Sequence, residues 1–344
     1  MPSVVDLFCG VGGLTHGFIK EGFTVVAGID VDPTCKYAYE TNNNARFILK
    51  DVRDLTSEEI VGLYPEGDTR ILVGCTPCQP FSRYANRKGQ DDKWQLVGTF
   101  AELISAVRPE IVSMENVPQM EKHPVFTDFI QALATEGYYT WYSVVNCLDY
   151  GIPQTRKRLV LLASRLGQIE MVRRTHPPGR HRTVAQTIRC LERLAAGEAS
   201  RKDPIHRASA LSELNLRRIK ATPPGGAWRD WDEGLQLDCH KKETGKTYPS
   251  IYGRMKWDEP SPTITCQCHG LGNGRFGHPE QDRAISLREA ALLQAFPKSY
   301  IFVETKSQVV ISNLARHIGN AVPVRLGRII ARSITRHLEE HRGQ

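Results

Sequence analysis

The sequence predicts an α/β fold whose mainly parallel sheet is covered by helices on both faces. Short apolar, β-branched runs alternate with amphipathic stretches over about the first 165 residues, which is the pattern of strands that alternate with helices. A glycine-rich segment directly follows the first run, as at a strand-to-helix turn of such folds. The expected strands cover residues 3–8, 23–30, 45–51, 70–75, 110–116, 139–146 and 158–164.

Two stretches between these strands carry clear helix signals. In residues 94–107, apolar side chains recur at helical spacing and would share one face. Residues 56–64 begin with Thr56, and Glu59 follows three positions later, which is the spacing of a capping box. In sheets built this way, ligands and reactive groups gather where the parallel strands end.

The pattern changes after about residue 167. Residues 173–260 are rich in Arg, Pro, Gly and His, with helical patterns only at 183–197 and 209–221. Helical patterns return in the last sixty residues. We therefore expect three segments, 1–167, 168–282 and 283–344, of which the last returns to the first domain.

Composition limits the classes of protein that this chain can be. Its 344 residues are 40% hydrophobic and 24% charged, which is typical of a globular protein. No apolar run approaches the ~18 residues of a membrane span, and the start lacks the pattern of a secretory signal. Nine irregularly spaced cysteines do not form a disulfide framework. We expect a cytoplasmic protein.

The net charge of +7 is unevenly distributed along the chain. Residues 168–282 contain 19 Lys and Arg against 14 Asp and Glu, so this segment carries five of the seven charges. Such a surplus is compatible with a polyanionic partner, and equally with a merely basic domain.

The segment "DLFCGVGGL", residues 6–14, predicts a ligand-binding turn. Gly10, Gly12 and Gly13 allow a tight turn and close approach of the backbone to a ligand. Asp30 ends the second expected strand and could accept hydrogen bonds from a ribose. The third glycine of a dinucleotide motif is replaced by Thr15, which favours a mononucleoside such as S-adenosylmethionine over NAD.

Asp51, which closes the third expected strand, could accept a hydrogen bond from an adenine amino group or be an exposed strand-end carboxylate. The alternative interpretation of residues 6–14 is a glycine-rich turn that binds no ligand.

Cys75 and Cys78 in "GCTPCQPFS", residues 74–82, allow three interpretations. If the pair were half of a zinc site, two further ligands would be needed. The only candidate cluster in the sequence is "CQCH" at residues 266–269, which has CxC rather than CxxC spacing. A redox dithiol would also follow a strand. Alternatively, Cys78 follows Pro77 in a loop at a strand's carboxyl end, where a nucleophile would face a ligand, and Cys75 ends the strand and points into the core.

Six motifs occur in the order found in the cytosine-5 DNA methyltransferase family, which the chain resembles over about residues 2–165 and 260–330. The resemblance is to the bacterial restriction-modification or orphan type. The motifs are "DLFCGVGG", "PCQPFS", "ENV" (115–117), "QTRKR" (154–158), "REAALLQAFP" (288–297) and "IGNAVP" (318–323).

The resemblance implies a Rossmann-like sheet that binds S-adenosylmethionine, with a second, smaller and irregular target-recognition domain. Residues 1–167 would be the catalytic and cofactor-binding domain and 168–282 the target-recognition domain. Residues 283–344 would form a hinge and return. The implied reaction moves a methyl group from S-adenosylmethionine to carbon 5 of a cytosine flipped out of duplex DNA, and leaves S-adenosylhomocysteine.

The resemblance also assigns catalytic roles. Cys78 would attack carbon 6 of cytosine, and Glu115 would stabilise the charge near N3. Arg156 and Arg158 would contact the base carbonyl and a nearby phosphate. Without the resemblance, Glu115 could be a helix cap and the two arginines a solvated basic patch.

Binding roles follow in the same way. Phe8 would pack on the adenine and Asp30 would hold the ribose. The cofactor site, without a metal, would comprise Phe8, Gly10, Gly12, Gly13, Asp30, Asp51, Pro77, Leu96 and Asn320. The loop after Cys78 would close over DNA, and Trp228 and Trp231 would offer base contacts. The expected DNA-binding residues are Gln79, Ser82, Arg83, Arg87, Arg229, Thr263 and Ile264.

The expected partner is double-stranded DNA, and through this DNA the protein would associate with the nucleoid. We expect the protein to bind DNA as a monomer. A cognate restriction endonuclease acting separately is compatible with the resemblance. Three alternatives remain: a tRNA methyltransferase of the same family, an NAD-dependent or thiol redox enzyme, and a DNA-binding protein without activity. The long basic middle segment favours DNA over tRNA.

Overall fold

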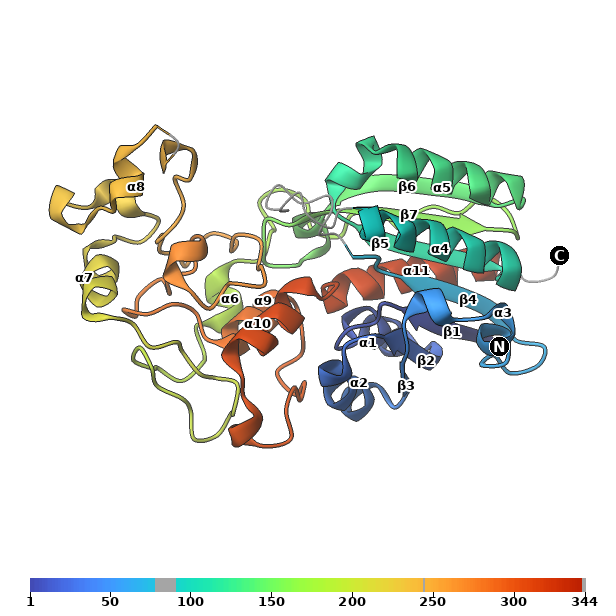
Figure 1. The fold of residues 1–344 in the computed structure, drawn as a ribbon, viewed down its shortest axis with the longest axis horizontal. Coiled ribbons are helices and arrows are strands. Elements are labelled where there is room, and N and C mark those ends of the chain that lie inside the picture. Colours follow the sequence, from blue (N-terminus) through green and yellow to red (C-terminus); the bar gives the residue numbers. More distant parts are fainter. Residues whose placement is uncertain (78–90, 244, 342–344) are drawn as a thin grey trace. The chain divides into compact units, whose positions relative to one another are not determined.

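The computed structural model describes residues 1–77, 91–243 and 245–341. The chain forms two compact units (Figure 1). Unit 1 comprises Met1–Tyr150, Lys157–Thr175 and Val322–Gln344, and unit 2 comprises Gly151–Arg156 and His176–Ala321. The chain therefore enters unit 2 twice and returns to unit 1 near its end.

Unit 1 contains a seven-stranded sheet with the order β3-β2-β1-β4-β5-β7-β6. The pairs from β3 through β5 are parallel, and β7 runs antiparallel to both β5 and β6. The predicted mainly parallel α/β sheet is confirmed, and every predicted strand is present to within two residues at each end. The strands are β1 (Pro2–Leu7), β2 (Thr24–Asp30), β3 (Arg46–Leu49), β4 (Thr69–Gly74), β5 (Ile111–Asn116), β6 (Tyr139–Asn146) and β7 (Lys157–Ser164).

Two of the differences from the predicted strand ends affect candidate site residues. β3 stops at Leu49, because its partner β2 ends at Asp30, which pairs with Leu49. Asp51 therefore does not close the strand; it caps the 3₁₀ helix η2 (Val52–Asp54), and its side chain accepts a hydrogen bond from Arg53 N. β4 ends at Gly74, so Cys75 is the first residue after the strand.

Helices cover both faces of this sheet, as predicted. Apolar residues of α3, α4 and α5 join Val5, Leu72 and Val112 in one core cluster. On the opposite face, Thr15 of α1 bonds to Asp6 of β1, and His337 of α11 bonds to Ser164 of β7. The helices are α1 (Gly13–Lys20), α2 (Lys36–Asn43), α3 (Ser57–Val61), α4 (Asp91–Val107), α5 (Pro124–Thr135) and α11 (Val324–Glu340).

The capping box at the start of α3 is confirmed. Thr56 Oγ1 accepts a hydrogen bond from Glu59 N at 3.2 Å, and Glu59 Oε2 accepts one from Thr56 N at 2.9 Å. None of the helices in the described part of the chain is long and apolar enough to cross a membrane.

α1 packs closely against α11, and glycines allow the close approach. A Cβ atom on Gly17 would lie 2.6 Å from Arg328 N and 2.7 Å from the carbonyl carbon of Gly327. We therefore expect Gly17→Ala to lower the free energy of unfolding by about 1–3 kcal/mol, because backbone atoms must shift to admit the methyl group. Urea unfolding measures this loss.

Gly98→Ala is the matched control for Gly17→Ala. Gly98 lies in α4 and is exposed, and an added Cβ would meet no atom within 4 Å. Alanine there should leave stability unchanged or raise it by about 1 kcal/mol, because alanine favours the helix. A Gly17→Ala protein as stable as the wild type would contradict the packing argument.

Unit 2 is irregular. Its described residues form no named strand and only isolated bridges. The helical patterns predicted at 183–197 and 209–221 correspond to shorter helices, α6 and α7. The helices are α6 (Val184–Ile188), α7 (Glu213–Ala221), α8 (Asp238–Lys241), α9 (Leu287–Leu293) and α10 (Ile311–Asn320).

Buried arginines hold unit 2 together where a sheet is lacking. Arg254 is 4% exposed and donates hydrogen bonds to the carbonyls of Thr222, His278 and Ile219. Arg283 and Glu289 form a fully buried pair in which two nitrogens each lie 2.7 Å from a carboxylate oxygen. Part of the arginine content of this unit is therefore structural.

Candidate active site

The glycine-rich loop of unit 1 adopts the tight turn that the sequence predicts. It follows β1, and Phe8, Gly10 and Gly12 have positive φ angles of 58°, 51° and 83°. Gly10 N donates a hydrogen bond to Asp30 Oδ2 at 2.9 Å, which joins the ends of β1 and β2. A Cβ on Gly10 would meet no atom within 4 Å, and α1 starts at Gly13 without a side-chain cap. The loop therefore has space and uncapped N–H groups to offer a polar ligand.

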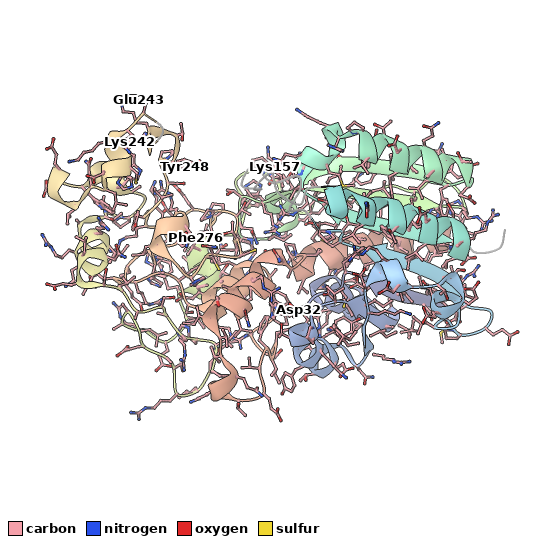
Figure 2. The ribbon with its side chains drawn as sticks, viewed as in Figure 1. Asp32, Lys157, Lys242, Glu243, Tyr248 and Phe276 are labelled. Carbon is pink, nitrogen blue, oxygen red and sulfur yellow. The ribbon has the colours of Figure 1, made fainter. Side chains whose placement is uncertain are left out.

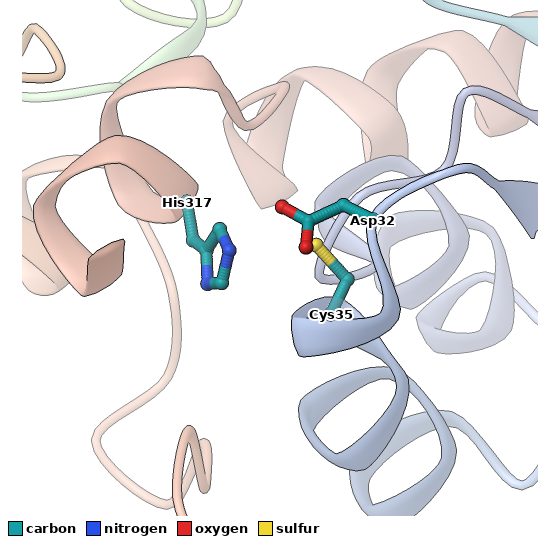
Figure 3. A group of neighbouring side chains, drawn as sticks. All are labelled: Asp32, Cys35 and His317. Atoms are coloured by element: carbon teal, nitrogen blue, oxygen red, sulfur yellow. The ribbon is translucent and has the colours of Figure 1, made fainter. Parts of the chain in front are cut away.

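Asp30 braces this loop. Its second oxygen, Oδ1, accepts a hydrogen bond from Asp32 N at 2.9 Å. A carboxylate can accept about four hydrogen bonds, so bracing the loop is compatible with binding a ribose hydroxyl. Asp32 in turn caps the 3₁₀ helix η1 (Pro33–Cys35), where Cys35 is the last residue. Figure 3 shows the side chains of Asp32 and Cys35, and that of His317 of α10.

The other predicted cofactor residues of unit 1 lie along neighbouring elements. Asp51 follows β3 and is paired with Arg53, whose hydrogen bond lowers the pKa of the Asp51 carboxyl. Pro77 and Leu96 are half-buried, after β4 and on α4 respectively. Within the predicted set in this unit, a hydrogen bond joins Gly10 and Asp30 directly.

Asp6 lies in β1, close before the loop, and was not predicted from the sequence as a site residue. It is buried in β1, and Thr15 Oγ1 donates a hydrogen bond to its Oδ2 at 2.6 Å. The hydroxyls of Thr15 and Tyr39 are 3.1 Å apart. Thr15, which departs from the dinucleotide motif, was the available signal. Burial raises the pKa of Asp6 to about 7, and the negative charge of Asp30 adds to the shift.

This buried carboxyl predicts a pH dependence of stability. The unfolded aspartate titrates near 3.8 and the folded one near 7. Between these values only the folded state binds the proton, so wild-type stability should fall as the pH rises, until the loss is complete above pH 7. Asn cannot titrate. Asp6→Asn should therefore gain stability relative to the wild type, by up to about 4 kcal/mol between pH 4 and pH 8.

Urea unfolding of both proteins across this pH range measures the difference. The comparison of slopes is informative even if Asp6→Asn is less stable at every pH. Parallel stability curves would show that Asp6 does not titrate in this window.

Glu115 is the centre of a second cluster at the carboxyl edge of the sheet. It is 3% exposed on β5, and its Oε1 lies 2.8 Å from Arg158 Nε in an ion pair. Cys75 Sγ donates a hydrogen bond to the other oxygen, Oε2, at 2.9 Å. Cys75 is thus half-buried and engaged with Glu115, and the expectation that it only packs into the core is wrong.

The structure also decides between two interpretations of these residues. The 3₁₀ helix after β5, η4 (Pro118–Lys122), has Val117 as its N-cap residue and no side-chain cap, so Glu115 is not a helix cap. The side chain of Arg158 is only 12% exposed, so it does not belong to a solvated basic patch.

The segment after β4 is tied to the end of β5. Asn116 Nδ2 donates hydrogen bonds to Thr76 O at 3.1 Å and to Thr76 Oγ1 at 2.8 Å. This fixes the chain up to Pro77, where the first described range ends. The predicted nucleophile and four predicted DNA-binding residues lie outside the described residues: Cys78, Gln79, Ser82, Arg83 and Arg87.

Arg156 belongs to unit 2, and it directly precedes β7. It is 2% exposed and donates hydrogen bonds to Ile264 O at 3.0 Å and Gly319 O at 3.3 Å. Gln154 Oε1 accepts a hydrogen bond from Ile264 N, and its Nε2 donates to Gln294 Oε1 at 2.6 Å. Segments distant in sequence, which include the "QTRKR" and "IGNAVP" motifs, therefore meet within this unit.

The remaining predicted residues of this region differ in exposure. Asn320, the last residue of α10, is exposed, and its Oδ1 accepts a hydrogen bond from Cys266 Sγ at 2.8 Å. Thr263 Oγ1 donates to Thr155 O at 2.9 Å. Ile264 is fully buried, so its side chain presents no surface to DNA in this structure.

The aromatic residues predicted to contact bases are instead core residues. Trp228 and Trp231 are each 5% exposed and pack together in a small cluster, and their indole N–H groups donate to Tyr248 O and Thr222 Oγ1. Arg229 lies between them in sequence and is exposed, with Nη2 2.7 Å from Lys246 O. Figure 2 labels the exposed Lys242, Glu243 and Tyr248 in this part of unit 2.

A thiol in unit 2 and a cluster of three side chains in unit 1 are relevant to metal binding. Burial raises the pKa of Cys268 to about 12, so this thiol would be a poor zinc ligand. In unit 1, His337, Glu340 and His341 place ligand atoms within 4.8 Å of one another. His337 Nε2 lies 2.7 Å from Ser164 Oγ, at the opposite end of β7 from Arg158, so this group is separate from the cluster around Glu115.

Comparison with known proteins adds three findings. The family model described as C-5 cytosine-specific DNA methylase matches residues 3–336. The chain is 55% identical over 340 residues to the Type II methylase M.HgiDII of Herpetosiphon aurantiacus, covering 98% of this chain and 96% of the relative. It is 27% identical over 352 residues to the Type II methyltransferase M.Sau96I of Staphylococcus aureus, covering 98% and 76%.

The fold also matches a solved structure. This is the crystal structure of a prophage-encoded protein of E. coli assigned as a DNA modification methyltransferase. The TM-score is 0.74 at 21% identity, and the match covers 98% of this chain and all of the other. At this identity the likeness concerns the fold.

Proposed function

Because the chain belongs to the C-5 cytosine-specific DNA methylase family, we propose that it methylates carbon 5 of a cytosine flipped out of duplex DNA, through an adduct with Cys78. The methyl donor is S-adenosylmethionine and the second product is S-adenosylhomocysteine. Membership of the family makes the chain a DNA (cytosine-5)-methyltransferase. We further propose the mechanism, the cofactor contacts and the DNA contacts described below.

The chemistry requires a nucleophile. Carbon 5 of cytosine reacts poorly until a nucleophile adds to carbon 6, and a thiolate is suited to that addition. Cys78 is the candidate by its place in "PCQPFS". After methyl transfer, loss of the carbon 5 proton allows the bond between carbon 6 and sulfur to break, which restores the thiolate.

Glu115 would stabilise the charge that the addition drives onto the ring. The support is its burial at the carboxyl edge of the sheet, with Arg158 on one oxygen and Cys75 on the other. A buried, braced carboxyl group can donate a proton to N3 in a fixed geometry, and the resulting carboxylate can accept a hydrogen bond from the protonated N3. Arg158 holds this carboxyl group through the ion pair. Because the family resemblance assigns Arg156 to the target base, we propose Arg156 as a further contact of the base.

The cofactor would bind at the glycine-rich loop, where it supplies an electrophilic methyl group. The open space at Gly10, the uncapped start of α1 and the position of Asp30 all fit such a ligand. Phe8 would contact the adenine. The resemblance to the family is the basis for the remaining proposed cofactor contacts: Gly12, Gly13, Asp51, Pro77, Leu96 and Asn320. We propose that the site contains no metal.

Duplex DNA hides carbon 6 within the base stack, so the target nucleotide must leave the helix, at a cost of roughly a few kcal/mol. We propose Gln79, Ser82, Arg83 and Arg87 as DNA contacts after the nucleophile. In unit 2, the exposed Arg229 and the half-buried Thr263 would contact DNA directly, and the buried Ile264 would support Thr263. Residues 168–282 would form the target-recognition domain.

The names of the relatives suggest a partner enzyme for this protein. Because M.HgiDII and M.Sau96I are named Type II enzymes, we propose that a cognate restriction endonuclease acts separately on the same DNA sequence. A monomer suffices, since one flipped base needs one active site.

The observation that carries this proposal is the family match over nearly the whole chain, together with a buried Glu115 fixed on both oxygens. Purified protein should transfer tritiated methyl groups from S-adenosylmethionine to unmethylated duplex DNA, and digestion should recover the label in 5-methylcytosine. Label in tRNA and none in DNA would favour the tRNA-modifying alternative. No transfer to either by folded protein would contradict the proposed activity.

A further inference from the structure

We infer that Cys75 is a positioning residue for the reaction, which holds the carboxylate of Glu115 through a hydrogen bond from its thiol. This inference rests on the proposed function of Glu115. It assigns a role to the thiol of "GCTPCQPFS" that neither nucleophilic attack nor core packing explains.

The sheet register places the two side chains side by side. β4 and β5 are parallel neighbours in which Gly74 pairs with Met114, so the next residues, Cys75 and Glu115, lie level. Cys75 N donates to Leu7 O at 3.3 Å, which extends the hydrogen bonding of β4 by one residue. Equivalent positions on neighbouring parallel strands point to the same face. The short side chain of Cys75 therefore reaches Oε2 of Glu115, at 2.9 Å.

The carboxylate is held from two sides by groups of different kinds. Arg158 on β7 supplies a positive charge 2.8 Å from Oε1, and Cys75 supplies a neutral donor to Oε2. Because β5 lies between β4 and β7 in the sheet, the guanidinium group and the thiol approach Glu115 from opposite sides. A carboxylate held by the ion pair alone could still rotate about its last side-chain torsion, which is a broad and weakly restricted one.

A second link adjacent to this one fixes the position of Cys75. Thr76 is 1% exposed and accepts hydrogen bonds from Asn116 through both its carbonyl and its hydroxyl oxygen. Two successive residues after β4 are thus bonded to two successive residues at the end of β5. The donor to Glu115 is therefore held by the backbone, which is what a positioning residue requires.

The test is the set Cys75→Ala, Cys75→Ser and Cys190→Ala in the full-length protein. Loss of the donor in Cys75→Ala should lower kcat for DNA methylation about 10-fold and leave the KM values for cofactor and DNA within a factor of two. Cys75→Ser retains a donor and should recover most of the rate. Cys190 is exposed in unit 2, and its replacement should have no effect.

A double-mutant cycle separates positioning from a general structural role. If Cys75 acts through Glu115, Cys75→Ala should cause no further loss of kcat in a Glu115→Gln background. Equal kcat values for Cys75→Ala and the wild type would overturn the inference, and so would additive losses in the cycle or a serine variant as slow as the alanine variant. If Glu115→Gln alone keeps the wild-type rate, the proposed role of Glu115 fails, and the inference fails with it.

Discussion

Replacement of Cys78 by alanine is expected to lower methyl transfer to DNA by at least about 10⁴-fold. Without the thiolate, nothing adds to carbon 6, and carbon 5 remains too weak a nucleophile to take the methyl group. Binding of S-adenosylmethionine should change little, because the glycine-rich loop and Asp30 are unaltered. The rate is measured with tritiated S-adenosylmethionine and duplex DNA, and cofactor binding by calorimetry.

A mechanism-based trap tests the same residue independently of turnover. In DNA that carries 5-fluorocytosine, the adduct cannot lose a proton from carbon 5 after methyl transfer, so the bond between carbon 6 and sulfur should persist. The wild type and Cys190→Ala should form a complex with this DNA that survives denaturation, and Cys78→Ala should form none. A denaturation-resistant complex of Cys78→Ala would assign the nucleophile to another residue.

Glu115→Gln is expected to have the second largest effect, a loss of about 10²–10⁴-fold in kcat. Glutamine keeps the size of the side chain and removes its charge and its acid-base chemistry. It also leaves Arg158, whose side chain is only 12% exposed, without its carboxylate partner. Single-turnover rates at saturating DNA and cofactor isolate the chemical step from binding.

Glu110→Gln provides the matched control. Glu110 precedes the opposite end of the same strand, β5, where its Oε2 accepts a hydrogen bond from Arg70 N at 2.6 Å. Loss of this carboxylate should leave kcat unchanged even if stability falls. Equal losses of kcat in the two variants would mean that Glu115 acts through the stability of the strand, and would contradict its chemical role.

The sheet could be predicted from the sequence because each strand is a short apolar, β-branched run bounded by polar residues. That local pattern fixes where strands form, but a strand ends where its partner ends. β3 stops at Leu49 because β2 stops at Asp30. The prediction extended β3 to Asp51, because the sequence of one strand contains no information on the length of the next.

The site could be predicted only in part. The loop, Asp30, Glu115 and Arg158 were predicted as candidate site residues from motifs, and the structure brings Gly10 to Asp30 and Arg158 to Glu115. The hydrogen bond from Cys75 to Glu115 depends on the register of two strands forty residues apart, which no local pattern reveals.

Unit 2 was the least predictable part. Trp228 and Trp231 flank two charged residues, which is typical of a nucleic-acid surface, yet both are buried. Arg254 likewise contributes to the positive charge of the segment, but it is buried and donates hydrogen bonds to the carbonyls of Thr222 and Ile219. Whether an arginine or tryptophan faces solvent depends on tertiary contacts, and an irregular fold offers no periodicity from which to infer them.

We propose that this protein methylates cytosine within a specific DNA sequence through Cys78. Bisulfite sequencing of the genome of a methylation-free host that expresses this protein, beside the same host with Cys78→Ala, tests it most directly. We predict cytosines protected from conversion within one short sequence, and none in the variant. A fully converted genome in cells that contain folded wild-type protein, or the same protection with Cys78→Ala, would contradict the claim.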